Sequence, residues 1–149
     1  MIKFKYATSK DSKILFSLIQ EMAIHHKQEA NLKTNDTLLG EAISNNKYNF
    51  EIILAYLQEK PVGYLSYYHN YSIWLAQNYL LIDDLFILEG FRGKNIGNLF
   101  MDRLKSTALE LNISQIRWEV EIDNIGAIKF YKNLGAQFYD KGIFKWNIS

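Results

Sequence analysis

The stretch Phe86-Ile87-Leu88-Glu89-Gly90-Phe91-Arg92-Gly93-Lys94-Asn95-Ile96-Gly97-Asn98-Leu99-Phe100 decides how the chain folds. An apolar run from Leu80 to Leu88 leads into it and is typical of a buried strand. A short turn rich in glycine and basic residues follows, and Leu99, Phe100 and Leu104 then recur at the spacing of one helix face. A strand, a glycine-bearing turn and a helix in this order point backbone N–H groups and the positive end of a helix dipole at one spot. The sequence therefore predicts a binding site for a phosphate or pyrophosphate group here.

Two common phosphate-binding loops do not fit this stretch. A Walker loop needs Gly, four further residues and then Gly-Lys-Ser/Thr, which the chain does not contain. A dinucleotide-binding fingerprint needs three glycines in a βαβ unit near the N-terminus, and this loop has neither the glycines nor that position.

The loop resembles the acetyl-CoA loop of the GNAT family of N-acetyltransferases, whose pattern is Arg/Gln-x-x-Gly-x-Gly/Ala. Arg92 and Gly97 take the first and last positions of this pattern, and Asn95 stands where the family has its middle glycine. Asparagine adopts left-handed backbone more readily than most residues, so we expect the loop to keep its shape.

A second segment strengthens the resemblance. The stretch Asn124-Ile125-Gly126-Ala127-Ile128-Lys129-Phe130-Tyr131-Lys132-Asn133-Leu134-Gly135-Ala136 looks like the closing motif of the family, and it follows the loop by about thirty residues, as in the family. The diamine (spermidine/spermine) acetyltransferase branch is the most similar. The segments that support this branch are Val62-Gly63-Tyr64, Tyr67-Tyr68, Trp74, Ile82-Asp83-Asp84-Leu85-Phe86 and Tyr131.

Length and composition limit the other possibilities. The 149 residues are 48% hydrophobic and 15% aromatic, enough for one domain with a sizeable core. The chain has no cysteine, which excludes disulfides, thiolate metal sites and a cysteine nucleophile. The net charge of +1 gives no case for nucleic-acid binding, which usually needs a clearly basic face. Lys3, Lys5 and Lys10 interrupt the N-terminal apolar residues, and no run is long enough to span a membrane, so we expect a cytoplasmic protein without a signal peptide. No metal is expected either.

The patterns of apolar residues predict alternating strands and helices in one domain, residues 1–149. Strands are expected at residues 2–7, 50–57, 62–71, 78–88, 115–121, 136–140 and 143–148. Helices are expected after Thr8 or Ser9, from Asn35 or Asp36, at residues 96–111 and at residues 124–133. The resemblance implies the α/β (α+β) GNAT fold: a central, mixed, mostly antiparallel sheet with helices on both faces and acetyl-CoA in a cleft where strands splay.

The resemblance also implies which residues bind acetyl-CoA. They lie at the end of the strand, in the loop, at the start of the helix and in the closing motif: Leu85, Phe86, Ile87, Arg92, Gly93, Lys94, Asn95, Ile96, Gly97, Asn98, Asn124, Ala127 and Tyr131. Family members carry a bulge near the position of Phe86 or Ile87, where a backbone N–H can polarise the thioester carbonyl.

Acetylation of an amine needs a proton acceptor, because an alkylammonium is only about one part in a thousand neutral at pH 7. Asp83 and Asp84 end the strand that runs to the loop, and on a regular strand they face opposite sides. In the diamine branch an acid at the position of Asp83 binds the amine and helps to accept its proton. The residues leave open whether Asp83 or Asp84 is the base, or whether either one only caps a turn or pairs with a cation.

Tyr131 is the candidate acid, because a phenol can protonate the departing sulfur. The resemblance supports this role, although most of the ten tyrosines are expected to be structural. We expect Glu29, Asp83, Asp84, Trp118 and Glu119 to contact the acceptor, and a solvated face remains the alternative for Glu29, Glu119 and Glu121. His25 and His26 are expected to be solvated and His69 to be structural.

The resemblance implies an N-acetyltransferase that moves an acetyl group from acetyl-CoA directly to a primary amine of a small cationic acceptor, a polyamine or diamine first. A lysine analogue, an aminoglycoside or a protein amine is the alternative acceptor, because a fold does not fix a substrate. A non-catalytic acyl-CoA-binding module is the alternative outside catalysis. Diamine acetyltransferases pair, so we expect a homodimer that uses the aromatic segment Phe144 to Trp146.

Overall fold

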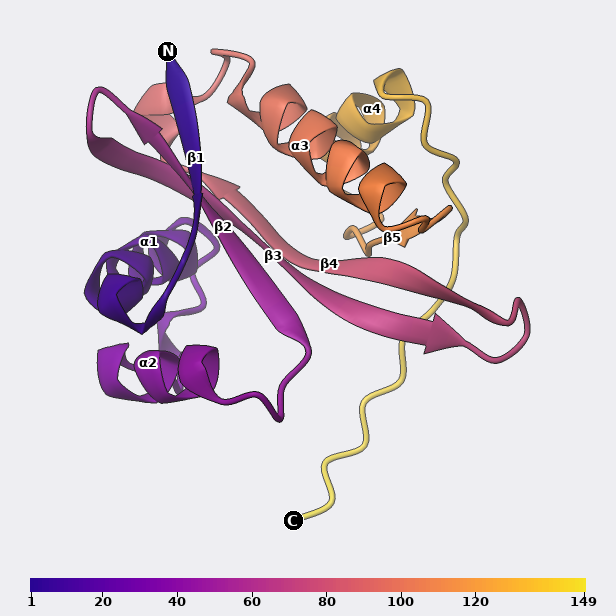
Figure 1. Cartoon of the computed structure of the whole chain (residues 1–149), viewed down its shortest axis with the longest axis horizontal. Helices are drawn as coiled ribbons and strands as arrows, with labels where there is room; N and C mark the ends of the chain where they lie inside the picture. The colour runs from indigo at the N-terminus through magenta and orange to yellow at the C-terminus, as the bar shows by residue number, and fades with distance from the viewer. The chain divides into compact units, whose positions relative to one another are not determined.

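The computed structural model describes all of residues 1–149 (Figure 1). They divide into two units, Met1–Trp118 and Glu119–Ser149. The first unit is built on one five-stranded sheet with strand order β1-β2-β3-β4-β5. The first four strands pair antiparallel and the fifth pairs parallel to β4, which confirms the mixed, mostly antiparallel sheet. Their bounds are β1 Ile2–Tyr6, β2 Phe50–Leu57, β3 Lys60–Ser72, β4 Gln77–Ile87 and β5 Ile116–Arg117.

The helices of this unit begin at the polar residues that the sequence marks. Their bounds are α1 Ser12–His25, α2 Asp36–Ser44 and α3 Ile96–Glu110, with 3₁₀ turns η1 Ser9–Asp11, η2 Glu29–Asn31 and η3 Glu89–Phe91. The Thr8 N–H donates to Asp11 Oδ2 at 2.8 Å in a capping box that starts η1. Asn35 starts α2, because its Oδ1 accepts from the Leu38 N–H at 2.9 Å.

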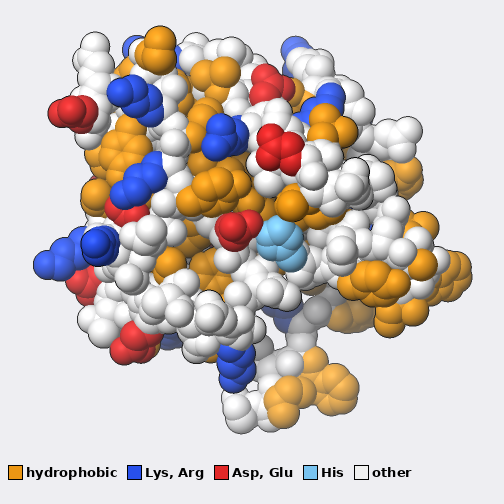
Figure 2. Space-filling view, in the orientation of Figure 1, with side chains coloured by type: hydrophobic (Ala, Val, Ile, Leu, Met, Phe, Trp, Pro, Cys, Tyr) orange, Lys and Arg blue, Asp and Glu red, His pale blue; other side chains and the backbone are white.

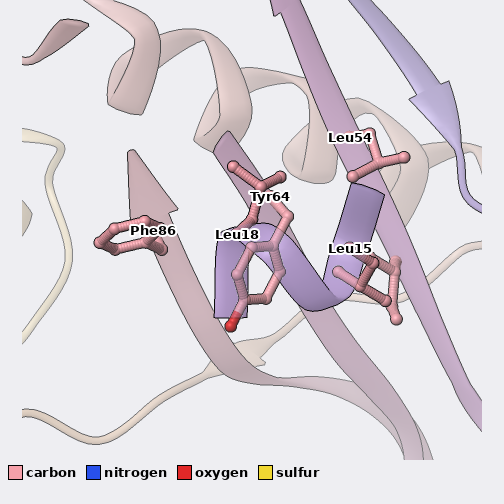
Figure 3. Close-up of a cluster of buried hydrophobic side chains, with 6 residues drawn as sticks. Leu15, Leu18, Leu54, Tyr64 and Phe86 are labelled. Carbon is pink, nitrogen blue, oxygen red and sulfur yellow. The ribbon is translucent and has the colours of Figure 1, made fainter. Parts of the chain in front are cut away.

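One face of the sheet, the α1 face, packs on α1. Leu15 and Leu18 of α1 form a buried cluster with Leu54 of β2, Tyr64 of β3 and Phe86 of β4 (Figure 3). Leu54 pairs with Tyr64 and Tyr64 pairs with Phe86, so these three side chains form one row across three strands.

The opposite face, the α3 face, packs on α3. Phe4 of β1 pairs with Ala55, the neighbour of Leu54, and therefore points away from α1. Its ring lies 5.0 Å from the ring of Phe100 in α3, centroid to centroid. Helices thus cover both faces of the sheet, as expected.

The second unit contains the helix α4 Ile125–Asn133. Asn124 caps this helix, because its Oδ1 accepts from the Ala127 N–H at 3.2 Å. Gly135 ends it with a left-handed φ of 95°, while the Gly135 and Ala136 N–H groups donate to the carbonyls of Lys132 and Tyr131. The Gly-Ala pair of the closing motif is therefore a helix stop.

Three predicted strands are wrong in whole or in part. The strand expected at residues 115–121 is only Ile116–Arg117, and residues 136–140 and 143–148 form no strand. Phe144 and Trp146 are exposed instead of buried on a sheet. An alternating apolar pattern forms a strand only beside a partner strand, and these residues have none within the chain.

The surface carries exposed hydrophobic side chains at the tip of the β3–β4 hairpin, at the right of Figure 2. Ile73, Trp74 and Leu75 form this tip, and Trp74 is 98% exposed. No helix of the chain combines the length and the apolar character that crossing a membrane requires.

Candidate active site

The loop between η3 and α3 takes the backbone shape that an anion-binding turn needs. Gly93 has a φ of 76° and Asn95 a φ of 66°, both in the left-handed region. Asn95 thus adopts the conformation for which glycine is the usual residue, and asparagine is among the few others that tolerate it. The substitution of the middle motif glycine does not prevent the turn.

The start of α3 is open to an anion. Asn95 is the residue before the helix, yet its side chain caps no N–H of the first turn and instead accepts a hydrogen bond from the Asn98 side chain. The first turn contains no acidic residue, and Lys94 is exposed beside it. The positive end of the helix dipole is therefore uncompensated by the chain, which fits the diphosphate of acetyl-CoA.

Arg92 is turned away from the open loop. Its Nε donates to the Ile87 carbonyl at 2.9 Å, and its Nη1 donates to Nε2 of His25 at 3.0 Å. The guanidinium also lies 5.6 Å from the ring centroid of Phe86. Arg92 thus ties the end of β4 to the last turn of α1, and His25, although exposed as expected, is its partner.

The edge of β4 beside this loop is unpaired. β5 pairs with β4 only at Leu80 and Leu81, and β4 continues to Ile87 without a neighbour on that side. Exposed backbone N–H and C=O groups on such an edge can pair with an extended ligand. This geometry fits the expected splayed cleft and its residues Leu85, Phe86 and Ile87.

The bulge in β4 lies at Asp83, so the expected position near Phe86 or Ile87 is wrong. Ser66 pairs with Asp84 and Tyr67 pairs with Ile82, which leaves Asp83 as the extra residue, while Phe86 and Ile87 pair regularly. An extra residue interrupts the alternation of side chains along a strand.

As a consequence, Asp83 and Asp84 do not face opposite sides, as a regular strand would require. Asp84 shares its row with Tyr64 on the α1 face, because the Tyr64 hydroxyl donates to Asp84 Oδ2 at 3.1 Å. The charges of both Asp83 and Asp84 act on Tyr64 and on Tyr68, two residues of the α1 face. The bulge therefore places both carboxylates on one face of the sheet.

The surroundings of this acid pair disfavour the ionised form of both carboxyl groups. Desolvation raises the pKa of Asp83, although its side chain keeps access to solvent. Desolvation and the neighbouring charge of Asp83 raise the pKa of Asp84, against a lowering by the Tyr64 hydrogen bond. The side-chain contacts of opposite or potentially opposite charge are the Lys5–Asp11 ion pair and the His69–Glu51 hydrogen bond, and neither of them involves the acid pair.

Tyr64 contacts the acid pair, and sequence reasoning did not single it out as a candidate site residue. Its side chain is 1% exposed and belongs to the buried cluster (Figure 3). Its hydroxyl donates to the carboxylate of Asp84. The alternation of Tyr64, Ser66 and Tyr68 places these three on one face, but only the bulge brings Asp83 to the same face.

The remaining predicted residues are placed as follows. Tyr131 lies in α4, is half-buried, and burial raises the pKa of its phenol. Trp118 is half-buried, whereas Glu29 in η2 and Glu119 are exposed. His69 donates to or accepts from Glu51 Oε2 at 2.8 Å, in agreement with a structural role.

A small pocket of about 200 Å³ lies elsewhere, at the start of β2. Its lining contains none of the predicted site residues, and the residues that form it are Tyr6, Ala7, Ile43, Phe50, Glu51 and Ile52.

Comparison with known families gives a match over most of the chain. The model of the Acetyltransferase (GNAT) family matches residues 15–136. This range includes both the anion-binding loop and the closing motif.

Several characterised relatives are similar in sequence. Thialysine N-epsilon-acetyltransferase of Mus musculus is 28% identical over 144 residues, which cover 91% of this chain and 84% of that protein. L-ornithine N5-acetyltransferase of Arabidopsis thaliana is 32% identical over 77 residues. This match covers 52% of this chain and only 34% of that protein. A spermidine/spermine N(1)-acetyltransferase-like protein of Homo sapiens is 26% identical over 90% of this chain and 20% of its own length.

Solved structures share the fold. An aminoglycoside acetyltransferase from an uncultured soil metagenomic sample, in complex with sisomicin, superposes with a TM-score of 0.85. The match covers 99% of this chain and 97% of that one at 16% sequence identity, a level that supports the fold alone.

Proposed function

Since the chain belongs to the GNAT family and is therefore an acetyl-transferring enzyme, we propose that it acetylates a primary amine of a small cationic acceptor of the diamine or polyamine type. The family uses acetyl-CoA as its co-substrate, and the uncapped start of α3, the left-handed loop and the unpaired edge of β4 fit this molecule. When bound, acetyl-CoA supplies a thioester whose carbonyl carbon accepts the amine.

The observation that carries the choice of acceptor is the acid pair, Asp83 and Asp84. Two neighbouring carboxylates lie on one face of the sheet without a lysine, arginine or histidine partner. A cationic amine would bind them by charge-assisted hydrogen bonds, and an acidic acceptor would be repelled. Glu29, Trp118 and Glu119 belong to the same proposal as further acceptor contacts.

The proton steps follow from the chemistry of the reaction. The acceptor enters as an ammonium and leaves as an amide, so its nitrogen loses two protons while the sulfur of the leaving thiol gains one. We assign the first proton to the acid pair and the proton on sulfur to Tyr131, whose raised pKa keeps the phenol protonated at neutral pH. The second proton from the nitrogen restores the Tyr131 phenol, and the first passes from the acid pair to water, so one proton is released per turnover.

The proposal treats residues 1–149 as one catalytic domain that works in the cytoplasm. The family match supports one domain, because it crosses the boundary between the two units. We also propose a homodimer, since Phe144 and Trp146 are exposed in the single chain and would find apolar contacts on a second copy. Light scattering at micromolar concentration should report a dimer, and a monomer would contradict this part.

A matched series of acceptors tests the proposed substrate class. Lysine and ornithine should each be compared with the diamine that differs only by loss of the carboxylate, 1,5-diaminopentane and 1,4-diaminobutane. With acetyl-CoA as donor and thiol release as the readout, we expect kcat/KM for each diamine to exceed that for its amino acid by about ten-fold or more, because the acid pair repels the carboxylate. Spermidine should rank with the diamines.

Two other outcomes would change the proposal. Preference for the amino acid of each pair would indicate a lysine-type acceptor, the activity that the name of the thialysine relative describes. Neutral or acidic amines as the best acceptors would contradict the cationic site altogether.

A further inference from the structure

Asp84 and Asp83 differ in the hydrogen bonds that they make with the rest of the protein. Asp84 Oδ2 accepts a hydrogen bond from the Tyr64 hydroxyl at 3.1 Å, and its backbone N–H donates to Ser66 Oγ at 3.1 Å. Asp83 is the bulged residue and makes no side-chain hydrogen bond. The two carboxylates are therefore neighbours of like charge with different supports.

Tyr64 holds its hydroxyl in a fixed place. The ring is packed among Leu15, Leu18 and Phe86, and the hydroxyl lies 3.4 Å from Sδ of Met22. A buried hydroxyl needs a strong acceptor, and the Asp84 carboxylate is the one it has. Burial and the charge of Asp84 raise the pKa of the Tyr64 phenol, so it stays a donor at every relevant pH.

A hydrogen bond donated to a carboxylate favours its ionised form. Within a pair of carboxylates that repel each other, a hydrogen bond donated to one of them shifts the first proton toward the other. The Tyr64 hydrogen bond lowers the pKa of Asp84 relative to what burial and the charge of Asp83 would give.

We propose that Tyr64 is a positioning residue of the acceptor site, which keeps Asp84 as the ionised, ammonium-binding carboxylate and so leaves Asp83 as the one that accepts the proton. This inference rests on the proposed function and deepens it. In the step concerned, one N–H bond of the ammonium breaks, its proton bonds to a carboxylate oxygen of Asp83, and the neutral amine keeps the electron pair with which it attacks the thioester. Water removes the proton from Asp83 before the next turnover.

The test is the pH profile of Tyr64→Phe. Without the hydroxyl, Asp84 competes for the proton and the pair stays protonated to higher pH. We expect kcat/KM for the best diamine to fall about 3- to 10-fold more at the acidic end of the profile than on its alkaline plateau, relative to wild type. A loss that is equal at all pH values would mean that Tyr64 only packs, and would overturn the inference.

Tyr67→Phe is the matched control. Tyr67 is also buried in β3, at 0% exposure, and its hydroxyl also donates to a carboxylate, Glu51 Oε2 at 2.9 Å, but on the α3 face. Its pH profile should be superimposable on that of wild type after scaling. A shift equal to that of Tyr64→Phe would show a general effect of losing a buried hydroxyl and would overturn the inference.

A second pair of variants covers the case in which Tyr64→Phe does not fold. Asp84→Asn should mainly raise KM for the diamine, whereas Asp83→Asn should mainly lower kcat, and the reverse pattern would overturn the inference. In the Asp84→Asn background, Tyr64→Phe should add no pH-dependent effect, because its partner carboxylate is gone. If the wild-type protein acetylates no amine at all, the proposed function fails and this inference fails with it. If the wild-type protein acetylates an amine and Tyr64→Phe lowers kcat/KM equally at all pH values, only this inference is overturned.

Discussion

Two tyrosines of β3 are built alike and differ in what surrounds them. Tyr64 and Tyr67 are both buried, and each donates a hydrogen bond to a carboxylate on its own face of the sheet. On the α3 face, Glu51 Oε2 also contacts Nε2 of His69 at 2.8 Å, and Tyr6 contacts the Tyr67 hydroxyl at 3.2 Å. On the α1 face, the neighbour of Asp84 is a second carboxylate, Asp83.

The comparison shows that a tyrosine–carboxylate pair is not in itself a sign of function. Glu51 Oε2 accepts from the Tyr67 hydroxyl and contacts Nε2 of His69, so this carboxylate has hydrogen-bond partners within the chain. Asp84 has a neighbour of the same charge and no cationic partner within the chain. The proposal of a cationic acceptor therefore rests on this neighbour and not on the tyrosine–carboxylate hydrogen bond.

The largest expected effect is a loss of activity when a carboxylate of the α1 face is neutralised, compared with the same change on the α3 face. Asp83→Asn removes the proposed proton acceptor and should lower kcat/KM for a diamine by about 100- to 1,000-fold, the range for loss of a general base. The rate should also rise more steeply with pH, because hydroxide or buffer must then take the proton. Glu51→Gln, the same kind of change on the α3 face, should lower kcat/KM less than about three-fold in the same assay. Similar losses in both variants would show that the two faces do not differ in function.

The next effect concerns a third tyrosine, whose hydroxyl is proposed to act on sulfur. Tyr131→Phe keeps the ring and should lower turnover by about 10- to 1,000-fold while acetyl-CoA binding is largely kept. Tyr139→Phe is the control in the same unit, because Tyr139 is exposed and bonds only Gln137. Turnover near that of wild type in Tyr131→Phe, with chemistry as the slow step, would assign Tyr131 to packing.

A third effect tests the start of α3, which is proposed to bind the negatively charged diphosphate of acetyl-CoA, whereas the acid pair is proposed to bind a cation. Gly97→Val puts a branched side chain where the backbone should approach the diphosphate, and acetyl-CoA affinity measured by calorimetry should fall about ten-fold or more. Gly90→Ala is the control, because a Cβ at Gly90 meets nothing within 4 Å. Asn95→Gly should change the affinity less than about two-fold, since Asn95 already has left-handed backbone. Unchanged affinity in folded Gly97→Val would place the co-substrate elsewhere.

The sequence predicts those features that depend on local patterns. The turn at Gly93 and Asn95, the caps Thr8 and Asn35, and the order of helices and strands up to residue 113 follow from neighbouring residues, and the structure has them. These features need no knowledge of distant partners, because caps and turns are satisfied within a few residues.

The features that sequence reasoning misplaced depend on partners far along the chain. The bulge at Asp83 follows from the pairing of β3 with β4, and one extra residue changes the face to which a side chain points. Arg92 meets His25 only because α1 ends beside the end of β4. Residues 143–148 alternate like a strand but have no neighbouring strand, so the pattern alone misleads.

The smallest expected effect is on stability. Neutralising a carboxylate should raise the melting temperature on the α1 face and lower it on the α3 face. The pKa values of Asp83 and Asp84 are raised in the folded chain, so as the pH rises the unfolded chain releases these protons before the folded chain does. The free energy of unfolding therefore falls as the pH rises from the ordinary carboxyl pKa to the raised one. At neutral pH the ionised pair therefore destabilises the fold. Asp83→Asn should raise the melting temperature by about 1 to 2 °C, a small gain because solvent screens this exposed carboxylate.

Glu51→Gln should do the opposite, because it weakens the hydrogen bonds of Tyr67 and His69 to a charged acceptor, and we expect a melting temperature about 2 to 4 °C lower. Calorimetric melts at neutral pH and at progressively lower pH provide the check. The gain in Asp83→Asn should shrink as the pH falls toward the ordinary carboxyl range, where Asp83 of the wild type is itself protonated. A gain that stays constant with pH would come from packing, and a loss of stability in Asp83→Asn would mean that the pair on the α1 face is compensated within the chain, like Glu51 on the other face.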